Sequence, residues 1–396
     1  MSFGTAFPPP SERVDAIRAA AVAAAELAIV TTARIAAVPA PTGEEMERSA
    51  VVRDLFASEG LATTVDQLGD VVAVIPGVRG GGTAVLLAAH LDTVFVAGTP
   101  LRVRRDKTRL HGPGVGDNSL GVAALVALPG LLRAAGFVPA VDLLLTGNVG
   151  EEGLGDLRGM RAVMDARPEV AAAVAIEGHN LGRVTHVAVG SRRLRITVRG
   201  AGGHSWGDFG RANAIHGLAG IITELDALAL PRAPKTTFNV GVIEGGVSVN
   251  TIAPEASCLL DLRSVDEAAL GQLADRVSRL MSKPRPGLTV TAEVIGNRPA
   301  GVVPLDSPIV RLATAVLAAL GVDAAYDASS TDANVPIARG IPAICIGLTT
   351  GGNVHRPDEY IDLAPVAVGL AQLALLGLGL ADAVAAGVDH PASAHH

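Results

Sequence analysis

Two histidines and four carboxylates of this sequence stand at the ends of apolar runs or in a glycine-rich loop. They are His90, Asp117, Glu151, Glu152, Glu177 and His355. Imidazole nitrogens and carboxylate oxygens are the ligands expected for zinc, and hydrolytic zinc sites keep one position open for water. Without Glu151, which is considered below as the general base, these residues are five candidate ligands, more than one ion needs. Two ions about 3.5–4 Å apart, bridged by one carboxylate, would use them all and leave room for a bridging water as the nucleophile.

The adjacent pair Glu151 and Glu152 suits a division of roles. One carboxylate would bind metal, and its neighbour, which we take to be Glu151, would accept the proton of the water and pass it to the leaving nitrogen. Asp92 is placed to hold the second N–H of the His90 ring, an arrangement common for metal-bound histidines. Taken singly, such a histidine is more often structural, a glutamate pair is usually surface charge, and Asp92 would be a turn residue. Because all of these residues occur together at the ends of apolar runs or in a glycine-rich loop, the pattern favours metal-dependent amide hydrolysis.

Four apolar runs precede most of these residues and must position them. The runs are Thr83–Ala89, Val141–Thr146, Ala171–Ile176 and Ala343–Gly347. In an open α/β sheet, ligands bind beyond the carboxyl ends of the strands, so residues distant in sequence converge there. Asp117 lies in the glycine-rich loop just ahead of a helix-like segment, residues 119–128. Pro129 is expected to kink or end that helix near Leu128.

The patterning predicts one domain inserted into another. Short apolar runs alternate with helix-like segments from residue 70 to 190, which is typical of βαβ units and a parallel sheet. From about residue 188 the alternation of apolar and polar residues predicts half-exposed antiparallel strands in a βαββαβ order. We therefore expect an α/β catalytic, metal-binding domain from residues 1–187 and 298–396, with an α+β domain, residues 188–297, inserted into it.

Composition narrows the possible functions. The chain has 396 residues, of which 49% are apolar and 18% charged, as in globular proteins of two domains. A net charge of −7 provides no basic patch for a nucleic acid. Two cysteines do not make a disulfide framework, and the N-terminus lacks the order of a signal peptide, so we expect a cytoplasmic protein. The apolar stretch Ala364–Ala381 is predicted to be a buried helix, so no membrane partner is expected.

At these residues the chain resembles the M20 metallopeptidase family over roughly residues 30 to 380. That family includes glutamate carboxypeptidases, peptidase T-like enzymes, acetylornithine deacetylases and succinyl-diaminopimelate desuccinylases. The motifs that carry the resemblance are His90-Leu91-Asp92-Thr93-Val94, Gly112 to Asp117, Glu151-Glu152-Gly153, Ile176-Glu177-Gly178 and the closing segment from His355 to Glu359. The resemblance implies a zinc-exopeptidase-like catalytic domain with a mixed, largely parallel sheet.

The resemblance also implies a role for each site residue. Asp117 would bridge two metal ions. His90 and Glu177 would complete the ligands of one ion, and Glu152 and His355 those of the other. Asp92 and Glu151 would be the two catalytic acids of the family. Two zinc ions per subunit are expected, with cobalt or manganese as alternatives.

The inserted domain is similar to the lid and dimerisation domain of the family. By this resemblance His204 would reach the active site of the other subunit of a homodimer and stabilise the oxyanion there. Asn250 and Arg263 would hold the substrate carboxylate, and Gly351 and Gly352 would let the backbone approach the substrate. Without the resemblance, His204 would be a turn residue, Arg263 a surface ion-pair residue and the glycine pair a plain turn.

These observations predict an exopeptidase that acts on small peptides. The same machinery would serve an N-acyl amino acid deacylase, which remains the alternative within the enzyme class. A catalytically silent binding protein of the same fold is a third possibility. Its signature would be loss of the base or a ligand, whereas Glu151 and the five ligand candidates are all present.

Overall fold

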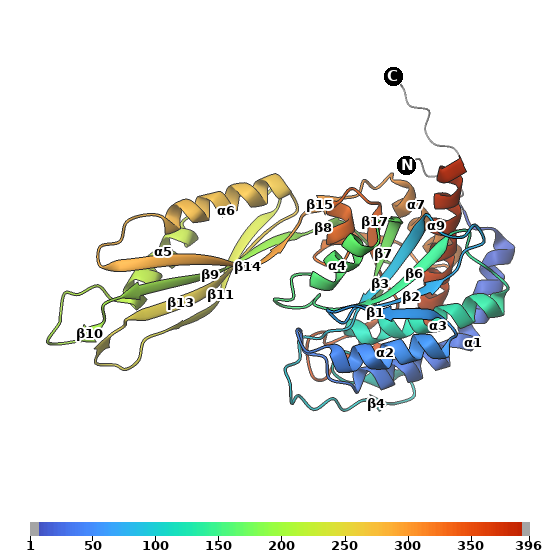
Figure 1. The fold of residues 1–396 in the computed structure, drawn as a ribbon, viewed down its shortest axis with the longest axis horizontal. Helices are drawn as coiled ribbons and strands as arrows, with labels where there is room; N and C mark the ends of the chain where they lie inside the picture. The colour runs from blue at the N-terminus through green and yellow to red at the C-terminus, as the bar shows by residue number, and fades with distance from the viewer. Residues whose placement is uncertain (1–7, 390–396) are drawn as a thin grey trace, which may run out of the picture. The chain divides into compact units, whose positions relative to one another are not determined.

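The computed structural model describes residues 8–389. The chain divides into two compact units, seen in Figure 1: Ala188–Gly301 forms the smaller unit, and the chain on both sides of it forms the larger one. The smaller unit ends at Gly301 rather than at residue 297, because its last long strand, β14 (Leu288–Arg298), pairs with its neighbour as far as Arg298.

A mixed sheet organises the larger unit, and within residues 8–389 it has nine strands. The order is β1-β2-β6-β3-β7-β17-β8-β15, with β16 paired to β8. The neighbours β6, β3, β7 and β17 are parallel, whereas β1, β2 and β8 join antiparallel. The bounds are β1 (Ala62–Val65), β2 (Val71–Ile75), β3 (Ala84–His90), β6 (Asp142–Asn148), β7 (Val170–Leu181), β8 (Arg183–Ala188), β15 (Gly301–Val302), β16 (Ala325–Ser329) and β17 (Ala343–Gly347). The predicted α/β class with a mixed sheet is confirmed.

The parallel centre of the sheet is buried, which explains its apolar sequence. All seven residues of β3 and all five of β17 are buried. Strands covered by helices on both faces read as continuous apolar runs rather than alternating ones. The helices of this unit are α1 (Ser11–Ala36), α2 (Met46–Ser58), α3 (Leu120–Ala135), α4 (Arg158–Ala166), α7 (Pro308–Ala319), α8 (Asn334–Ala338) and α9 (Val366–Asp389). In Figure 1, α2 and α3 run beneath the sheet.

A second, small sheet in the larger unit joins two distant segments. Its order is β18-β19-β5-β4, and all its pairs are antiparallel. The strands are β4 (Arg104–Arg105), β5 (Arg109–His111), β18 (Gly351–Gly352) and β19 (Tyr360–Asp362). Since β5 leads into the glycine-rich loop and β19 follows His355, this sheet sets the segments that carry Asp117 and His355 side by side.

Pro129 lies inside α3, but the helix does not end at Leu128 and continues to Ala135. Proline lacks the N–H that would bond to the carbonyl one turn earlier. The helix nevertheless persists because Leu125, Leu131 and Leu132, on both sides of the proline, are buried in the core. Tertiary packing of apolar side chains supplies most of the stability of such a helix.

Among residues 8–389, three helical segments are long and apolar enough to cross a membrane, judged by length and composition alone. They are Ser11–Ala36, Val115–Ala135 and Val366–Gly387. The last two are largely buried in the core: 89% and 78% of their most apolar stretches are buried, against 39% for the first. The last is the predicted buried C-terminal helix.

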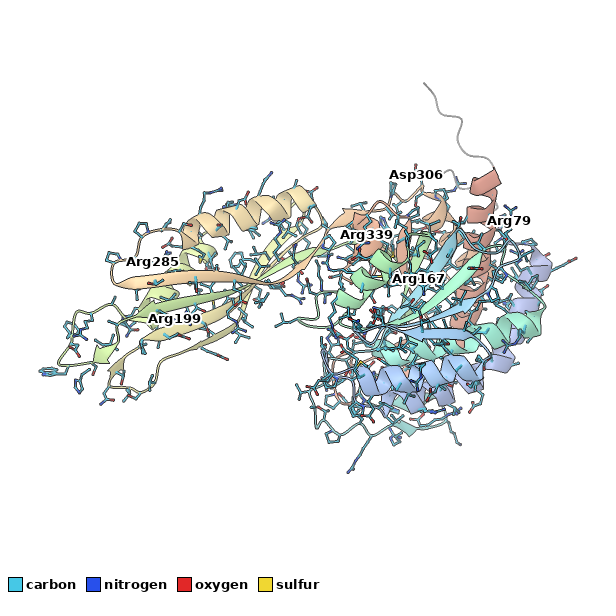
Figure 2. All side chains as sticks on the ribbon, in the orientation of Figure 1. Arg79, Arg167, Arg199, Arg285, Asp306 and Arg339 are labelled. Carbon is cyan, nitrogen blue, oxygen red and sulfur yellow. The ribbon has the colours of Figure 1, made fainter. Side chains whose placement is uncertain are left out.

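The smaller unit has the predicted βαββαβ order. Its sheet, within the fully described residues 188–301, runs β11-β13-β9-β14, with two helices packed over an apolar core that includes Ile196, Leu260 and Leu273. Asn213 and Asp266 cap the helices by accepting backbone N–H groups. Figure 2 labels Arg199 on this sheet, where its Nε lies 2.7 Å from Oε2 of Glu255 on the neighbouring strand. The bounds are β9 (Gly190–Gly200), β10 (Gly203–His204), α5 (Ala214–Asp226), β11 (Thr236–Gly245), β12 (Thr251–Ile252), β13 (Glu255–Ser264) and α6 (Glu267–Met281).

A buried arginine fastens α2 to the loop after β3. Arg48 is 1% exposed, and its Nε donates to the carbonyl of Val38 at 3.0 Å and its Nη1 to the carbonyl of Leu91 at 2.8 Å. Burial lowers the pKa of Arg48 to about 10, opposed by the nearby Asp92 carboxylate. The guanidinium therefore satisfies carbonyl groups of two segments, one of which leads directly into Asp92.

Replacing Arg48 with Met is expected to destabilise the larger unit by about 2–4 kcal/mol, because the buried carbonyl of Leu91 and the partly buried carbonyl of Val38 lose their charged donor. Denaturant unfolding followed by circular dichroism measures the change. Arg53→Met is the matched control on the same helix, since Arg53 is half exposed and bonds its neighbour Asp54; its effect should stay within about 0.5 kcal/mol. Equal losses in both variants would contradict the role of Arg48.

Candidate metal centre

The five predicted ligands converge at the carboxyl edge of the parallel strands. His90 is the last residue of β3, Glu152 lies in the turn after β6, and Glu177 lies in β7. Asp117 lies in the segment η1 (Val115–Ser119), where its own backbone is not helical, and His355 lies between β18 and β19. His90, Asp117 and Glu152 offer ligand atoms within 4.8 Å of one another. Segments more than 250 residues apart in sequence thus meet at one place.

Glu177 lies within β7 rather than just past its end, which differs from the sequence prediction. Between β7 and β17, Ile176 pairs with Ile346 and Leu181 pairs with Gly347. The residues between Ile176 and Leu181 therefore bulge from the ladder, and a bulge re-aims side chains at the rim of a sheet. The strand continues after the bulge, which is why its end could not be read from the apolar run.

Asp117 is shared between the two histidines. Its Oδ1 lies 3.0 Å from Nε2 of His90, and its Oδ2 lies 2.9 Å from Nε2 of His355. One carboxylate oxygen faces each imidazole, which is the arrangement that a bridging ligand requires.

A second carboxylate accompanies each histidine. Glu177 Oε2 lies 3.7 Å from Nε2 of His90, and Glu152 Oε1 lies 3.1 Å from Nε2 of His355. Two clusters of one imidazole and one glutamate therefore share Asp117. The family resemblance predicts the same two groups as the ligands of two ions, and this assignment stays a prediction.

The carboxylates strongly favour positive charge at both histidines. Burial alone would lower the pKa of His90, but the nearby carboxylates of Asp117, Asp92 and Glu177 raise it well above the ordinary value. Contacts with Asp117 and Glu152 raise the pKa of His355 to about 10. The environment at each Nε2 therefore attracts a cation.

The carboxylates themselves differ in their pKa values. Burial would raise the pKa of Asp117, yet His355 and His90 hold it below its usual range. For Glu177, burial outweighs the contact with His90, and the negative charges of Asp117 and Asp332 add to the effect, so its pKa is raised. Negative charge is more concentrated here than the histidines alone can balance.

The His90 ring is set to present Nε2 as a ligand atom. Nδ1 lies 3.0 Å from the backbone carbonyl of Asp92, so the ring donates a proton there. Nε2 is buried and, although 3.0 Å from Asp117, lacks hydrogen-bond geometry. A buried nitrogen aimed at carboxylate oxygens without a hydrogen bond fits a metal ion between them. The donor set of imidazoles and carboxylates suits zinc, cobalt or manganese.

Asp92 fixes the turn that carries the glutamate pair. The side chain is fully buried; Oδ1 accepts the backbone N–H of Glu151 at 3.0 Å, and Oδ2 accepts that of Glu152 at 2.9 Å. Thr42 donates its hydroxyl to Oδ2 at 2.8 Å. Oδ1 lies 3.6 Å from Nδ1 of His90. The backbone carbonyl of Asp92, rather than the predicted carboxylate, thus accepts the His90 ring proton. The carboxylate holds the backbone of Glu151, whose side chain is buried, as is that of Glu152.

The sequence analysis did not select three residues that hydrogen-bond to the segments carrying the candidate ligands. Thr42, Arg48 and Glu359 all bond to ligand-bearing segments, but none follows a strand or sits in a glycine-rich loop. The best available signal was for Glu359, an acidic residue four residues after His355 at the end of the closing motif of the family resemblance. An acid at such a position is usually exposed, so the pattern gave little reason to select it.

His204 and Asn250 lie together in the smaller unit. β10 pairs with β12, and the N–H of Ser205 donates to the carbonyl of Asn250 at 2.9 Å. Nδ1 of His204 accepts the N–H groups of Trp206 and Gly207, each at 3.2 Å. A neutral His204 ring therefore carries its proton on Nε2, where it is a hydrogen-bond donor.

The remaining substrate-site candidates lie in separate places. Arg263, on β13, holds the carboxylate of Asp261 at 2.6 Å and keeps 41% of its side chain exposed. Gly351 and Gly352 form β18, and a side chain on Gly351 would collide with His179. The ion pair with Asp261 is what we would expect if Arg263 were only a surface ion-pair residue.

Comparison with known proteins places this geometry in a family. The family model described as peptidase family M20/M25/M40 matches residues 86–377. A protein assigned as the succinyl-diaminopimelate desuccinylase DapE of Mycobacterium tuberculosis is 31% identical over 294 residues, 71% of this chain and 78% of that protein.

Two solved structures share the fold. Aminopeptidase PepT from Bacillus cereus matches 90% of this chain and 99% of its own, with a TM-score of 0.74 and 19% identity. The YxeP protein of Bacillus subtilis, a dinuclear metal-binding peptidase, matches 91% of this chain and 99% of its own, with a TM-score of 0.66 and 17% identity. With the sequence match over most of its length, this chain belongs to the M20/M25/M40 peptidase family.

Proposed function

We propose that this protein hydrolyses an amide bond in small peptides or N-acyl amino acids at a centre of two divalent metal ions. The observation that carries the proposal is Asp117, which directs one oxygen to His90 and the other to His355. A bridging carboxylate between two half-sites is the arrangement of two-metal hydrolytic centres. Membership of a peptidase family supports the reaction class.

In this proposal His90 and Glu177 hold one ion, Glu152 and His355 hold the other, and Asp117 binds both. When bound, the ions lower the pKa of water and polarise the substrate carbonyl. Zinc is the proposed metal, because imidazole and carboxylate are its usual ligands in hydrolases. Cobalt and manganese suit the same ligands.

Glu151 is the proposed general base. It takes a proton from the attacking water and returns it to the leaving nitrogen. The Asp92 carboxylate keeps Glu151 in place by accepting its backbone N–H, and the backbone carbonyl of Asp92 orients the ring of His90. A silent binding protein is disfavoured, because the buried Glu151 and all five ligand candidates are retained.

The substrate is proposed to carry a free carboxylate next to the scissile bond. Arg263 is the proposed partner of that carboxylate, because its guanidinium is partly exposed and its planar fork suits a carboxylate, which would take the place of the Asp261 carboxylate that it now contacts. Exopeptidase activity is the first choice, and its support is the likeness of fold to PepT. Deacylation of an N-acyl amino acid is the second candidate, favoured by the sequence match to the DapE protein.

The smaller unit is proposed to act as a lid and dimerisation domain. His204 would donate from Nε2 to the oxyanion in the other subunit of a homodimer, and Asn250, beside it, would contact the substrate together with Gly351 and Gly352. A cytoplasmic location is proposed because Cys258 and Cys345 are both buried and unpaired, as expected in a reducing compartment.

Metal dependence provides the first test. Chelated enzyme should not turn over dipeptides, tripeptides or N-acyl amino acids, and added zinc, cobalt or manganese should restore turnover, measured by mass spectrometry of the products. The products identify the scissile bond and so separate exopeptidase from deacylase. Equal turnover before and after complete metal removal would contradict the proposal.

Substituting Glu151 with Gln should lower kcat by about 10²–10⁴-fold, because the base is lost while the fold and the metal ligands remain. Initial rates, together with metal content by mass spectrometry, measure both effects. Glu47→Gln, on an exposed position of α2, is the matched control and should keep normal turnover. Near-normal kcat in metal-loaded Glu151→Gln protein would refute the role of the base.

Complementation tests whether His204 acts across subunits. His204→Ala and Glu151→Gln homodimers should each be nearly inactive, but a refolded mixture should recover roughly a quarter of wild-type activity, since each hybrid dimer has one intact site. Turnover of the mixture is compared with that of the separate variants. No recovery, in a mixture shown to contain hybrid dimers, would place His204 outside the partner's site.

A further inference from the structure

Glu359 lies at the centre of a buried contact that the reaction scheme does not use. Its side chain is completely buried, and Oε2 accepts the backbone N–H of Gly114 at 2.8 Å. Oε1 accepts the N–H groups of Gly116 and Asp117, each at 2.9 Å. The backbone carbonyl of Glu359 also accepts the N–H of Gly112 at 2.9 Å. Residues 112–117, the loop that ends at the shared carboxylate, are thus bound to one side chain.

His179 extends the contact to a third segment. Its Nε2 lies 2.8 Å from Oε1 of Glu359, and the ring is 7% exposed. His179 follows Glu177 by two residues in β7, while Glu359 follows His355 by four residues. The Glu359–His179 contact therefore joins the segments that carry Asp117, Glu177 and His355.

Close packing leaves this contact little freedom. A methyl group added at Gly116 would overlap the ring of His179, and one added at Gly178 would overlap the carbonyl of Gly116. Neither glycine has a left-handed φ, so the requirement for glycine is one of space. The loop before Asp117 is thereby held against β7 as well as against Glu359.

We propose that Glu359 is a positioning residue for the metal centre, which acts with His179 to set where the Asp117 carboxylate stands relative to His90 and His355. The inference rests on the proposed two-metal function. Hydrogen bonds beyond the ligands orient them, and losing one commonly weakens metal binding or activity by roughly 10–100-fold. Here a single side chain acts on the loop of the shared ligand through several bonds.

Glu359→Gln is the first test, because it keeps the size of the side chain but not its two acceptors. A glutamine has one acceptor oxygen and an NH2 group, so at least one loop N–H must face another donor. Asp106→Asn is the matched control: Asp106 accepts the N–H groups of Thr108 and Arg109 and contacts Nε2 of His111, but it is partly exposed in the β4–β5 turn.

Gly116→Ala provides a second variant that leaves Glu359 intact. Its methyl group should push the loop away from His179. Gly81→Ala is its control, since a methyl group there meets no atom within 4 Å and the position has no left-handed φ. This pair keeps the proposal testable if Glu359→Gln fails to fold.

The measurement is a titration of metal-free protein with Co²⁺, followed by visible absorption and by bound-metal analysis after dialysis. Glu359→Gln and Gly116→Ala should bind Co²⁺ roughly 10–100-fold more weakly than wild type and show an altered absorption spectrum, because the ligand geometry changes. Both controls should match wild type. Thermal unfolding of each metal-free variant verifies that the fold is kept.

Wild-type affinity and spectrum in folded Glu359→Gln and Gly116→Ala proteins would overturn the role of Glu359. So would equal weakening in Asp106→Asn and Gly81→Ala. Failure of the wild-type protein to bind Co²⁺ would instead overturn the proposed metal centre, and the positioning role with it. The two failures are distinguishable because the second appears before any variant is compared.

Discussion

Mutual repulsion of carboxylates at one edge of the sheet is the constraint on which the rest of this structure depends. Asp117, Glu152 and Glu177 stand within 2.9–3.7 Å of the two imidazole Nε2 atoms, and Asp332 adds its negative charge to the burial that raises the pKa of Glu177. Such a cluster disperses unless cations balance it and the backbone holds it. The strand edge, the loops and the buried supports around it serve that requirement.

Two further buried acids, Asp92 and Glu359, supply most of the backbone support. Each is fully buried and uses both carboxylate oxygens to accept main-chain N–H groups. Asp92 holds the turn of the glutamate pair, and Glu359 holds the loop of Asp117. A buried carboxyl group is stable only when its oxygens are satisfied, and here the satisfied oxygens also fix the positions of the ligand-bearing loops.

In the proposed function, the division into two units would separate the residues of the reaction from those that select the substrate. All five ligand candidates and Glu151 belong to the larger unit, whereas His204, Asn250 and Arg263 belong to the smaller one. In the proposed function, peptidases and deacylases use the same metal chemistry and differ in what surrounds the substrate. Residues of the smaller unit and the turn at Gly351 and Gly352 are therefore where the choice of substrate is expected to lie.

The sequence by itself determined the α/β class, the βαββαβ order of the smaller unit and the positions of the candidate ligands. Apolar runs that end in His90 or precede Glu151 and Glu152 are local patterns, and local patterns can be read along the chain. The end of β7 could not be read in this way, because the bulge after Ile176 depends on pairing with β17. The helix that continues past Pro129 depends likewise on packing in the core.

Only the tertiary structure decided which groups support the ligands. Asp92 bonds the backbone of Glu151 and Glu152, about 60 residues away, and Glu359 bonds that of Asp117, about 240 residues away. Backbone N–H groups are identical at nearly every position, so no residue type marks which of them a distant carboxylate will accept. The candidate ligands can be recognised in the sequence by their side chains. The residues that hold them in place cannot, because only the fold brings each buried carboxylate to the backbone N–H groups that it accepts.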